Sequence, residues 1–130
     1  MNSENVKVLI VDDDESYLTI FKMALQNEGI VADSFSNPVH ALETLKTQQY
    51  DLILLDYFMP EMTGEVFTQQ LREFDDKTVV ILQTGYADES TPLDLLKRID
   101  IQGYFDKTKG IEAFITIIAM LVKTIAKCKK

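Results

Sequence analysis

The sequence predicts an α/β fold in which a doubly wound, five-stranded parallel sheet is covered by helices on both faces. Short apolar runs alternate with amphipathic stretches five times along the 130 residues. Several of these runs are apolar on both faces, which is typical of buried parallel strands. The regular alternation of strand and helix favours crossover connections and therefore parallel strands. The expected strands cover residues 6–11, 30–35, 52–55, 79–82 and 103–105.

The helices are predicted from their termini and from apolar spacing. Gly29 ends the first helical pattern, because glycine readily adopts the backbone conformation that terminates a helix. Asn37 can cap the second helix, which has Pro38 at its first position. The other three helices are expected to begin at Gly64, at Thr91-Pro92 and at Ile111. The apolar positions of the first four helices are Tyr17, Leu18, Phe21, Ala24, Leu25, Val39, Leu42, Leu45, Val66, Phe67, Leu71, Phe74, Leu95, Leu96 and Ile99.

Composition limits the partners of the chain. Acidic residues outnumber basic ones by 21 to 13, and the net charge of −8 repels nucleic-acid phosphates and anionic membrane surfaces. No apolar run approaches the roughly 20 residues that span a bilayer. The single cysteine, Cys128, has no partner for an intrachain disulfide. We therefore expect one cytoplasmic domain over residues 1–130, with 126–130 as a flexible tail or the start of a linker, and no direct nucleic-acid or membrane binding.

Polar residues follow four of the five expected strands. Asp12 and Asp13 follow the first, Asp56 the third, Thr84 the fourth and Lys107 the fifth. In a parallel sheet covered on both faces, ligands bind beyond the carboxyl ends of the strands. Each residue alone has a structural explanation, such as helix capping or exposure to solvent. Three converging carboxylates, however, raise one another's pKa and destabilise a fold unless positive charge compensates them.

Such a cluster is suited to phosphoryl transfer. Mg²⁺ prefers carboxylates, waters and phosphate oxygens, and no histidine or cysteine accompanies the acids at the strand ends. A transferring phosphoryl group needs an in-line nucleophile and positive charge beside its equatorial oxygens. Asp56 can attack the phosphorus while Mg²⁺ and Lys107 hold the charge.

Four segments of the chain resemble the CheY-like receiver domains of two-component response regulators. They are residues 8–15, 51–64, 80–84 and 103–107, and the Met-Pro and Gly that follow Asp56 have the spacing of that family. The resemblance covers essentially the whole chain. It implies a flavodoxin-like fold with five helices and strand order 2-1-3-4-5. It also implies that a sensor histidine kinase or a phosphotransfer protein phosphorylates Asp56.

The resemblance assigns roles to individual residues. Asp12 and Asp13 would hold Mg²⁺ together with Asp56, and the main-chain carbonyl of Phe58 would be a further ligand. In this family the side chains two residues after the phosphoacceptor and two after the threonine flank the path of the hydrolytic water. These positions are Phe58 and Tyr86 here, and their bulk predicts slow loss of the phosphoryl group.

The same resemblance predicts a conformational switch. Thr84 would hydrogen-bond the phosphoryl group, Lys107 would pair with it, and Tyr104 would move inward as Thr84 is drawn toward the phosphate. The output surface would be helix four, strand five and helix five. The chain departs from the family at Thr108, where proline usually follows the lysine, so the cis or trans state of the Lys107–Thr108 bond stays open. Gly85 stands where the family commonly has alanine. A fourth helix that begins at Pro92 would leave a long loop over residues 85–90.

The last helix carries two apolar stripes. The core stripe consists of Ile111, Phe114, Ile115, Ile118, Leu121, Val122 and Ile125, in a helix ending near Lys127. Ala113, Ile117 and Met120 form a second stripe, which predicts contact with a partner protein or with a second copy of the chain. His40 lies away from every strand end, so the phosphodonor histidine is expected on another protein.

Parts of the sequence also fit two other functional classes. The segment 12–16 after an apolar strand also fits the start of haloacid-dehalogenase-like phosphatases, in which Asp12 would be the nucleophile. That reading leaves the segment around Asp56 unexplained. The second alternative is a pseudo-receiver, an interaction module that is not phosphorylated, and the presence of all five site residues argues against it.

Overall fold

The fold is a five-stranded parallel sheet, described by a computed structural model over residues 6–85 and 92–129. The strands are β1 (Val8–Val11), β2 (Ala32–Phe35), β3 (Leu52–Asp56), β4 (Val79–Thr84) and β5 (Gly103–Asp106). All neighbouring strands pair in parallel, in the order β2-β1-β3-β4-β5. The predicted α/β class and strand order are therefore confirmed.

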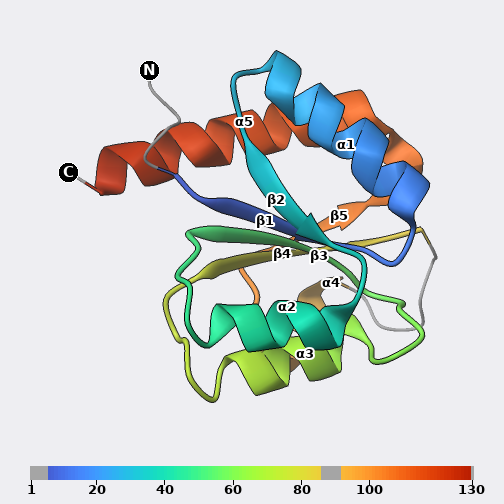
Figure 1. The fold of residues 1–130 in the computed structure, drawn as a ribbon, viewed down its shortest axis with the longest axis vertical. Helices are drawn as coiled ribbons and strands as arrows, with labels where there is room; N and C mark the ends of the chain where they lie inside the picture. The colour runs from blue at the N-terminus through green and yellow to red at the C-terminus, as the bar shows by residue number, and fades with distance from the viewer. Residues whose placement is uncertain (1–5, 86–91, 130) are drawn as a thin grey trace.

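Helices cover both faces of the sheet, as Figure 1 shows. One face carries α1 (Glu15–Asn27) and α5 (Ile111–Cys128), and the other carries α2 (Pro38–Leu45), α3 (Gly64–Leu71) and α4 (Pro92–Arg98). Helix α5 includes residues 126–128, which the sequence leaves as a possible tail. Within the described ranges, no helix is both long enough and apolar enough to cross a bilayer.

The core has two parts because successive strand residues point to opposite faces of the sheet. Between the sheet and helices α1 and α5 lie the buried side chains of Val8, Ile10, Leu18, Phe21, Leu25, Leu52, Leu54, Ile81, Phe105, Phe114, Ile118 and Val122. Between the sheet and the other helices lie Leu9, Val11, Leu42, Leu45, Ile53, Leu55, Phe67, Leu71, Val80, Leu82, Leu95 and Ile99. The even-numbered residues of β1 and β3 thus face α1 and α5. Asp12 and Asp56, which continue the even positions at the ends of these strands, are therefore expected on the same side.

The start of β2 differs from the prediction for a local reason. Gly29 ends α1 at φ 77°, as expected, and its N–H donates to the Gln26 carbonyl at 2.9 Å. The N–H of Ile30 donates to the Leu25 carbonyl at 3.0 Å, which completes a Schellman-type helix end. Ile30 therefore belongs to the helix terminus, and β2 begins two residues later, at Ala32.

Four apolar helix positions predicted to face the core, among them Val39, are exposed instead. Helix α3 ends at Leu71, so Phe74 lies beyond it, and its side chain is 41% exposed. Val66 and Leu96 also face solvent. Thr68 takes the buried place on α3, where its hydroxyl donates to the Gly64 carbonyl at 2.8 Å. A polar residue is tolerated there because its hydrogen bond is made within the helix.

Gly64 allows α3 to begin against the end of β3. Its N–H donates to the Tyr57 carbonyl at 2.6 Å. A Cβ at this position would lie 2.9 Å from the Asp56 carbonyl oxygen and 2.8 Å from Cδ2 of Leu82. Only glycine fits this approach without displacing the backbone that carries Asp56.

Candidate functional site

Three carboxylates meet at the carboxyl ends of β1 and β3. Asp12 and Asp13 follow β1, and Asp56 is the last residue of β3, the neighbouring strand. Each of the three offers a carboxylate oxygen, and these oxygens lie within 4.8 Å of one another. Asp12 is 0% exposed and Asp56 is 6% exposed, whereas Asp13 faces solvent. The sequence therefore predicted which acids the fold brings together.

Lys107 supplies positive charge to this cluster. It begins η2 (Lys107–Lys109), a short 3₁₀ helix directly after β5. Its Nζ donates to Asp12 Oδ2 at 2.8 Å and lies 3.4 Å from Asp56 Oδ1. The other oxygen of Asp12 accepts a hydrogen bond from the Asp14 N–H at 2.9 Å. Asp12 is thus held on both oxygens, while Asp14 caps α1 by accepting from the Tyr17 N–H.

The electrostatics of the site follow from its burial. Burial raises the pKa of Asp56 to about 7, and the charge of Asp12 adds to this while Lys107 opposes it. Burial also raises the pKa of Asp12, against the hydrogen bond from Lys107. Burial lowers the pKa of Lys107, but its hydrogen bond to Asp12 and the charges of both carboxylates outweigh this, so the net shift is upward. One lysine therefore compensates two buried acids only in part.

The segment after Lys107 needs no proline to hold its shape. The Lys107–Thr108 bond is trans, since the described residues contain no cis peptide bond. The Asp106 carboxylate accepts hydrogen bonds from the N–H of Thr108 at 2.8 Å and from its hydroxyl at 2.7 Å. These bonds cap the short helix and fix the chain on both sides of Lys107.

The two predicted switch residues lie on the opposite face of the sheet from the acids. Thr84 ends β4 and is 2% exposed. Tyr104 of β5 pairs in register with Leu82 and packs against the cluster beneath α2, α3 and α4. Period-two alternation places Thr84 on the same side as Leu82. The two residues are near neighbours on one face of the sheet, and their role as a switch stays a prediction.

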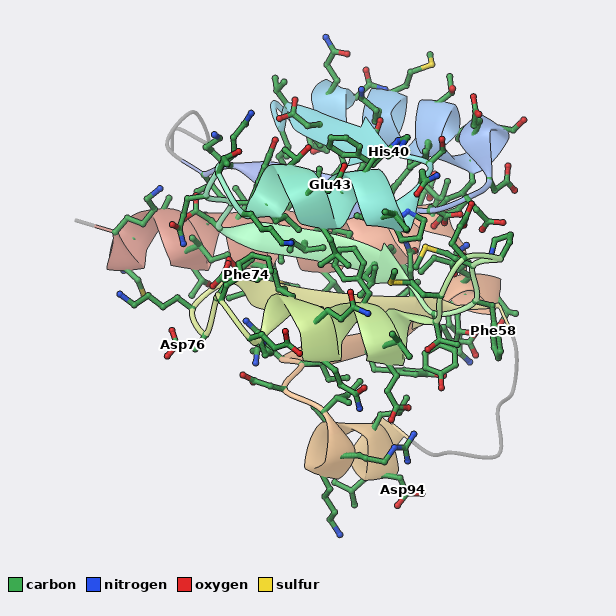
Figure 2. The ribbon with its side chains drawn as sticks, turned by 60° about the horizontal axis from the view of Figure 1, so that its bottom comes forward. His40, Glu43, Phe58, Phe74, Asp76 and Asp94 are labelled. Carbon is green, nitrogen blue, oxygen red and sulfur yellow. The ribbon has the colours of Figure 1, made fainter. Side chains whose placement is uncertain are left out.

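Phe58 lies in the loop that joins β3 to α3, two residues after Asp56 (Figure 2). Its side chain is 41% exposed, and its ring meets that of Tyr57 edge to face, with centroids 4.7 Å apart. Its predicted roles as a carbonyl ligand and in water access stay predictions. Tyr86, its expected partner in excluding water, lies outside the described residues, as does most of the expected 85–90 loop.

Sequence reasoning missed the contact between Lys107 and Tyr17 and the hydrogen bond between Tyr17 and Gln83. Tyr17, expected only as part of the apolar stripe of α1, lies with its ring centroid 4.3 Å from Lys107 Nζ. The Tyr17 hydroxyl donates to Gln83 Oε1 at 3.0 Å. Gln83 is fully buried in β4. A glutamine in an otherwise apolar strand is the signal that could have indicated this contact.

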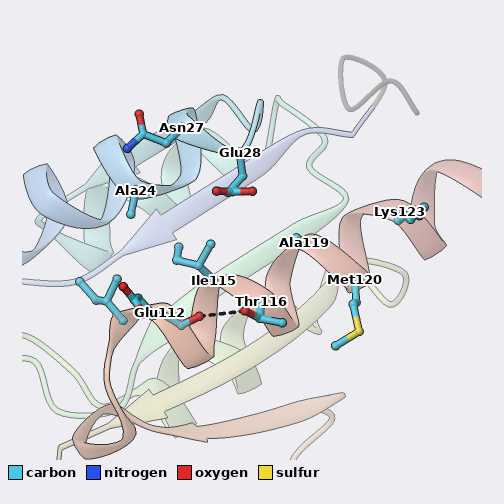
Figure 3. A pocket seen from close by; sticks show the side chains of 10 residues that line it. Ala24, Asn27, Glu28, Glu112, Ile115, Thr116, Ala119, Met120 and Lys123 are labelled. Atoms are coloured by element: carbon cyan, nitrogen blue, oxygen red, sulfur yellow. Dashed lines mark hydrogen bonds between the residues drawn. The ribbon is translucent and has the colours of Figure 1, made fainter.

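A groove of about 630 Å³ lies between α1 and α5, away from the carboxylates. Figure 3 shows Ile115 pointing from α5 toward α1, with Ala24 across the groove and Glu28 beside it. Acidic and basic side chains border this groove, but none of the predicted site residues lines it. Ala113, Ile117 and Met120, the second stripe of α5, are exposed, as predicted.

Comparison with known proteins identifies a receiver domain. The family model described as the response regulator receiver domain matches residues 8–119. The transcriptional regulatory protein ZraR of Klebsiella oxytoca is 33% identical over 97 residues, which are 75% of this chain and 22% of that protein. The sensor kinase/phosphatase LuxN of Vibrio campbellii is 30% identical over 113 residues, 87% of this chain and 13% of LuxN. The chain thus spans less than a quarter of the length of either relative.

Solved structures agree with these matches. The receiver domain of a Francisella response regulator is 28% identical with a TM-score of 0.79, over 97% of this chain and 100% of that one. The response regulator TrrA of Thermotoga maritima, solved in complex with Mg²⁺ and beryllofluoride, is 26% identical with a TM-score of 0.77, over 89% of this chain and 98% of that one. From its fold, its acidic cluster and these matches, the chain belongs to the receiver domains of two-component response regulators.

Proposed function

We propose that Asp56 accepts a phosphoryl group from the phosphohistidine of a sensor histidine kinase or a phosphotransfer protein, with Mg²⁺ bound at Asp12, Asp13 and Asp56. The observation that carries this proposal is the cluster of three carboxylates within 4.8 Å beside the Lys107 ammonium group. The donors are all oxygens, which suits a hard cation such as Mg²⁺. The Mg²⁺ and beryllofluoride in the TrrA structure support the same chemistry here.

In the proposed reaction, a carboxylate oxygen of Asp56 attacks the phosphorus as the bond to the donor histidine nitrogen breaks. Mg²⁺, when bound, neutralises charge on the carboxylates and on the phosphoryl oxygens. Lys107 is already within reach of Asp56 and would pair with a second phosphoryl oxygen. The Thr84 hydroxyl would hydrogen-bond another oxygen. No general base is needed, because the nucleophile is a carboxylate.

The expected output is a change on the surface formed by α4, β5 and α5. Thr84 and Tyr104 would couple that surface to the phosphoryl group. Exposed apolar side chains on α4 and α5, namely Leu93, Leu96, Ile117 and Met120, support a contact there with an output partner or a second copy. We further propose that residues 1–130 act as one cytoplasmic receiver domain without direct nucleic-acid or membrane binding, in keeping with the net charge of −8.

The test is uptake of a phosphoryl group from a small donor such as acetyl phosphate, followed by intact-protein mass spectrometry. With Mg²⁺ we expect a mass increase of one phosphoryl group, and with a chelator in place of Mg²⁺ we expect none. Uptake that is indifferent to the metal, or no uptake under either condition, would contradict the proposal.

Replacing Asp13 with asparagine should stabilise the metal-free protein and weaken Mg²⁺ binding. Asp13 adds negative charge beside two buried acids, and no hydrogen bond to its side chain compensates for this among the described residues. We expect a melting temperature about 2 °C higher without Mg²⁺, and Mg²⁺ affinity about tenfold weaker.

Asp76→Asn is the matched control, since it removes the same charge from an exposed residue outside the carboxylate cluster. Asp76→Asn should change neither the melting temperature without Mg²⁺ nor the affinity for Mg²⁺. A clearly lower melting temperature for Asp13→Asn would mean that Asp13 is a structural partner in the fold.

A Phe58→Asn, Tyr86→Glu variant should shorten the lifetime of phosphorylated Asp56. Hydrolysis needs a water in line with phosphorus, and Phe58 offers no group that would orient it. The polar replacements should raise the decay rate by about tenfold, measured as loss of the phosphorylated mass with Mg²⁺ present. If the wild-type protein decays as fast as the variant, these side chains do not limit access of water.

A further inference from the structure

Lys107 is held from three sides. Its Nζ lies 2.8 Å from Asp12 Oδ2, 3.4 Å from Asp56 Oδ1 and 4.3 Å from the centroid of the Tyr17 ring. The two carboxylates attract the ammonium group, and the negative face of the aromatic ring does so from the side of α1. A lysine side chain is flexible and loses rotamer entropy when it is fixed. A third contact therefore helps to hold the ammonium group in one position.

The Tyr17 ring is itself anchored to the sheet. Its hydroxyl donates to Gln83 Oε1 at 3.0 Å. Gln83 is opposite Asp56 in the β3–β4 register, and the N–H of Tyr57 donates to its carbonyl at 2.9 Å. Burial and the nearby charges of Asp12 and Asp56 raise the pKa of Tyr17, so its hydroxyl remains a donor. The tyrosine ring that contacts Lys107 is therefore hydrogen-bonded to β4, which is the strand next to the one that carries Asp56.

A column of aromatic rings fixes Tyr17 from the other side. The Tyr17 ring lies 5.5 Å from that of Phe21, which stacks on Phe114 at 5.3 Å. Phe114 stacks in turn on Phe105 at 4.2 Å. Phe105 belongs to β5, two residues before Lys107. The column thus runs from the ring beside the Lys107 ammonium group to β5, the strand that directly precedes Lys107.

Gln83 contributes little to stability in this position. Its Nε2 is buried, and it has no hydrogen-bond partner within the described part of the chain. A buried donor without an acceptor is costly, and an aliphatic side chain would fill the same space without that cost. An amide at this position, with its oxygen accepting from the Tyr17 hydroxyl, favours a role in holding that hydroxyl.

We infer that Tyr17, anchored by Gln83, is a positioning residue that keeps the Lys107 ammonium group between Asp12 and Asp56. This inference rests on the proposed phosphoryl transfer to Asp56. The ring closes the side of the ammonium group that faces α1, so the charge stays where the oxygens of an incoming phosphoryl group would lie. Tyr17 acts through Lys107 and touches neither the phosphoryl group nor the metal.

The test compares Tyr17→Leu, which removes the ring, with Tyr17→Phe, which keeps it. At saturating Mg²⁺, phosphoryl uptake from acetyl phosphate should be about tenfold slower in Tyr17→Leu and no more than about threefold slower in Tyr17→Phe. Mg²⁺ affinity should stay within about twofold of the wild type in both, because neither change removes a carboxylate ligand. Equal loss of rate in the two variants, or a parallel loss of Mg²⁺ affinity, would overturn the inference.

Tyr50 provides a matched control. It also lies beneath a lysine, with Lys7 Nζ 4.9 Å from its ring centroid, and its hydroxyl donates to Asp33. Tyr50→Leu should leave uptake unchanged. A Tyr17→Phe, Gln83→Leu double variant removes both polar partners and keeps the ring. The double variant should have a melting temperature no lower than that of Tyr17→Phe, and it should take up the phosphoryl group at the same rate as Tyr17→Phe. If Tyr50→Leu also took up the phosphoryl group slowly, the slow uptake of Tyr17→Leu would reflect a general loss of packing and not the position of Lys107.

A spectroscopic readout separates this inference from the proposed function. The ε-methylene protons of Lys107 should show a ring-current shift in the metal-free wild type and in Tyr17→Phe, and lose it in Tyr17→Leu. If the wild-type protein takes up no phosphoryl group, the proposed function fails, yet this comparison still tests where Lys107 is held. An unchanged shift in Tyr17→Leu would contradict the positioning role directly.

Discussion

Methionine in place of Lys107 is expected to destabilise the protein and to slow phosphoryl uptake more than any substitution of a residue that is not itself a carboxylate of the site. Among the described residues, Lys107 is the one cation within ion-pair distance of Asp12 and Asp56. Its removal leaves the fully buried Asp12 without its partner, which costs about 3 kcal/mol in other buried pairs. Uptake should fall about 100-fold, as when a preorganised donor to a transition-state oxygen is lost.

The loss should depend on pH and metal in a defined way. Without Mg²⁺ the buried acids become more ionised as the pH rises, so the variant should unfold more readily at pH 8 than at lower pH. Acid or Mg²⁺ should restore part of its stability. Lys129→Met is the control, because Lys129 pairs with Asp51 at 3.0 Å on the surface, where such pairs contribute little. Equal stability of the two variants in urea at pH 8 would show that Lys107 does not compensate the buried charge.

The metal-free wild type should become less stable as the pH rises from 5.5 to 7.5. The pKa of Asp56 is raised from 3.8 to about 7 in the folded protein. Between these values the folded state binds a proton that the unfolded state has released, so the free energy of unfolding falls with rising pH and levels off above 7. Asp12, with its own raised pKa, acts in the same direction. We expect a decrease of about 2 kcal/mol across this range.

Urea unfolding at the two pH values measures this difference. The raised pKa of Lys107 contributes equally at both, because the ammonium group is protonated throughout the range. Asp56→Asn should flatten the profile, and saturating Mg²⁺ should reverse the trend by binding the ionised carboxylates. A wild-type profile that rises toward pH 7.5 without metal would mean that Asp56 is stabilised as a carboxylate in the fold.

The sequence was sufficient for the topology and for the acidic cluster. Buried parallel strands need apolar side chains on both faces, which made the strands easy to recognise, and the ends of adjacent strands necessarily meet. With the strand order that the resemblance implies, Asp12 and Asp56 could be placed at the ends of neighbouring strands, and Lys107 at the same edge of the sheet, without coordinates. The roles within the run 12–14 could not be separated, because capping and burial depend on where α1 begins. The structure assigns the cap to Asp14 and burial to Asp12.

The contacts between α1 and residues at the ends of the strands were not found from the apolar periodicity of the sequence. Tyr17 fits the apolar period of α1 whether or not its hydroxyl has a partner, so its contacts with Lys107 and Gln83 had no periodic signal. Phe74 failed for a different reason, since α3 ends at Leu71 and its period does not continue. Val66 lies within α3, but on its exposed side. The bond after Lys107 is trans, as is usual where no proline follows, and the cap that Asp106 places on the short helix was not foreseen from the sequence.

Locating the phosphoryl group on the chain tests the central claim most directly. The phosphorylated protein is reduced with borohydride, which converts an aspartyl phosphate to homoserine, and the modified residue is identified by peptide mass spectrometry. We predict modification at Asp56, and none in Asp56→Asn. Modification at Asp12 would instead support the haloacid-dehalogenase-like alternative, although that carboxylate is buried and held on both oxygens. The absence of any modified residue in the Mg²⁺-loaded wild type would contradict a phosphoacceptor role and support the pseudo-receiver alternative.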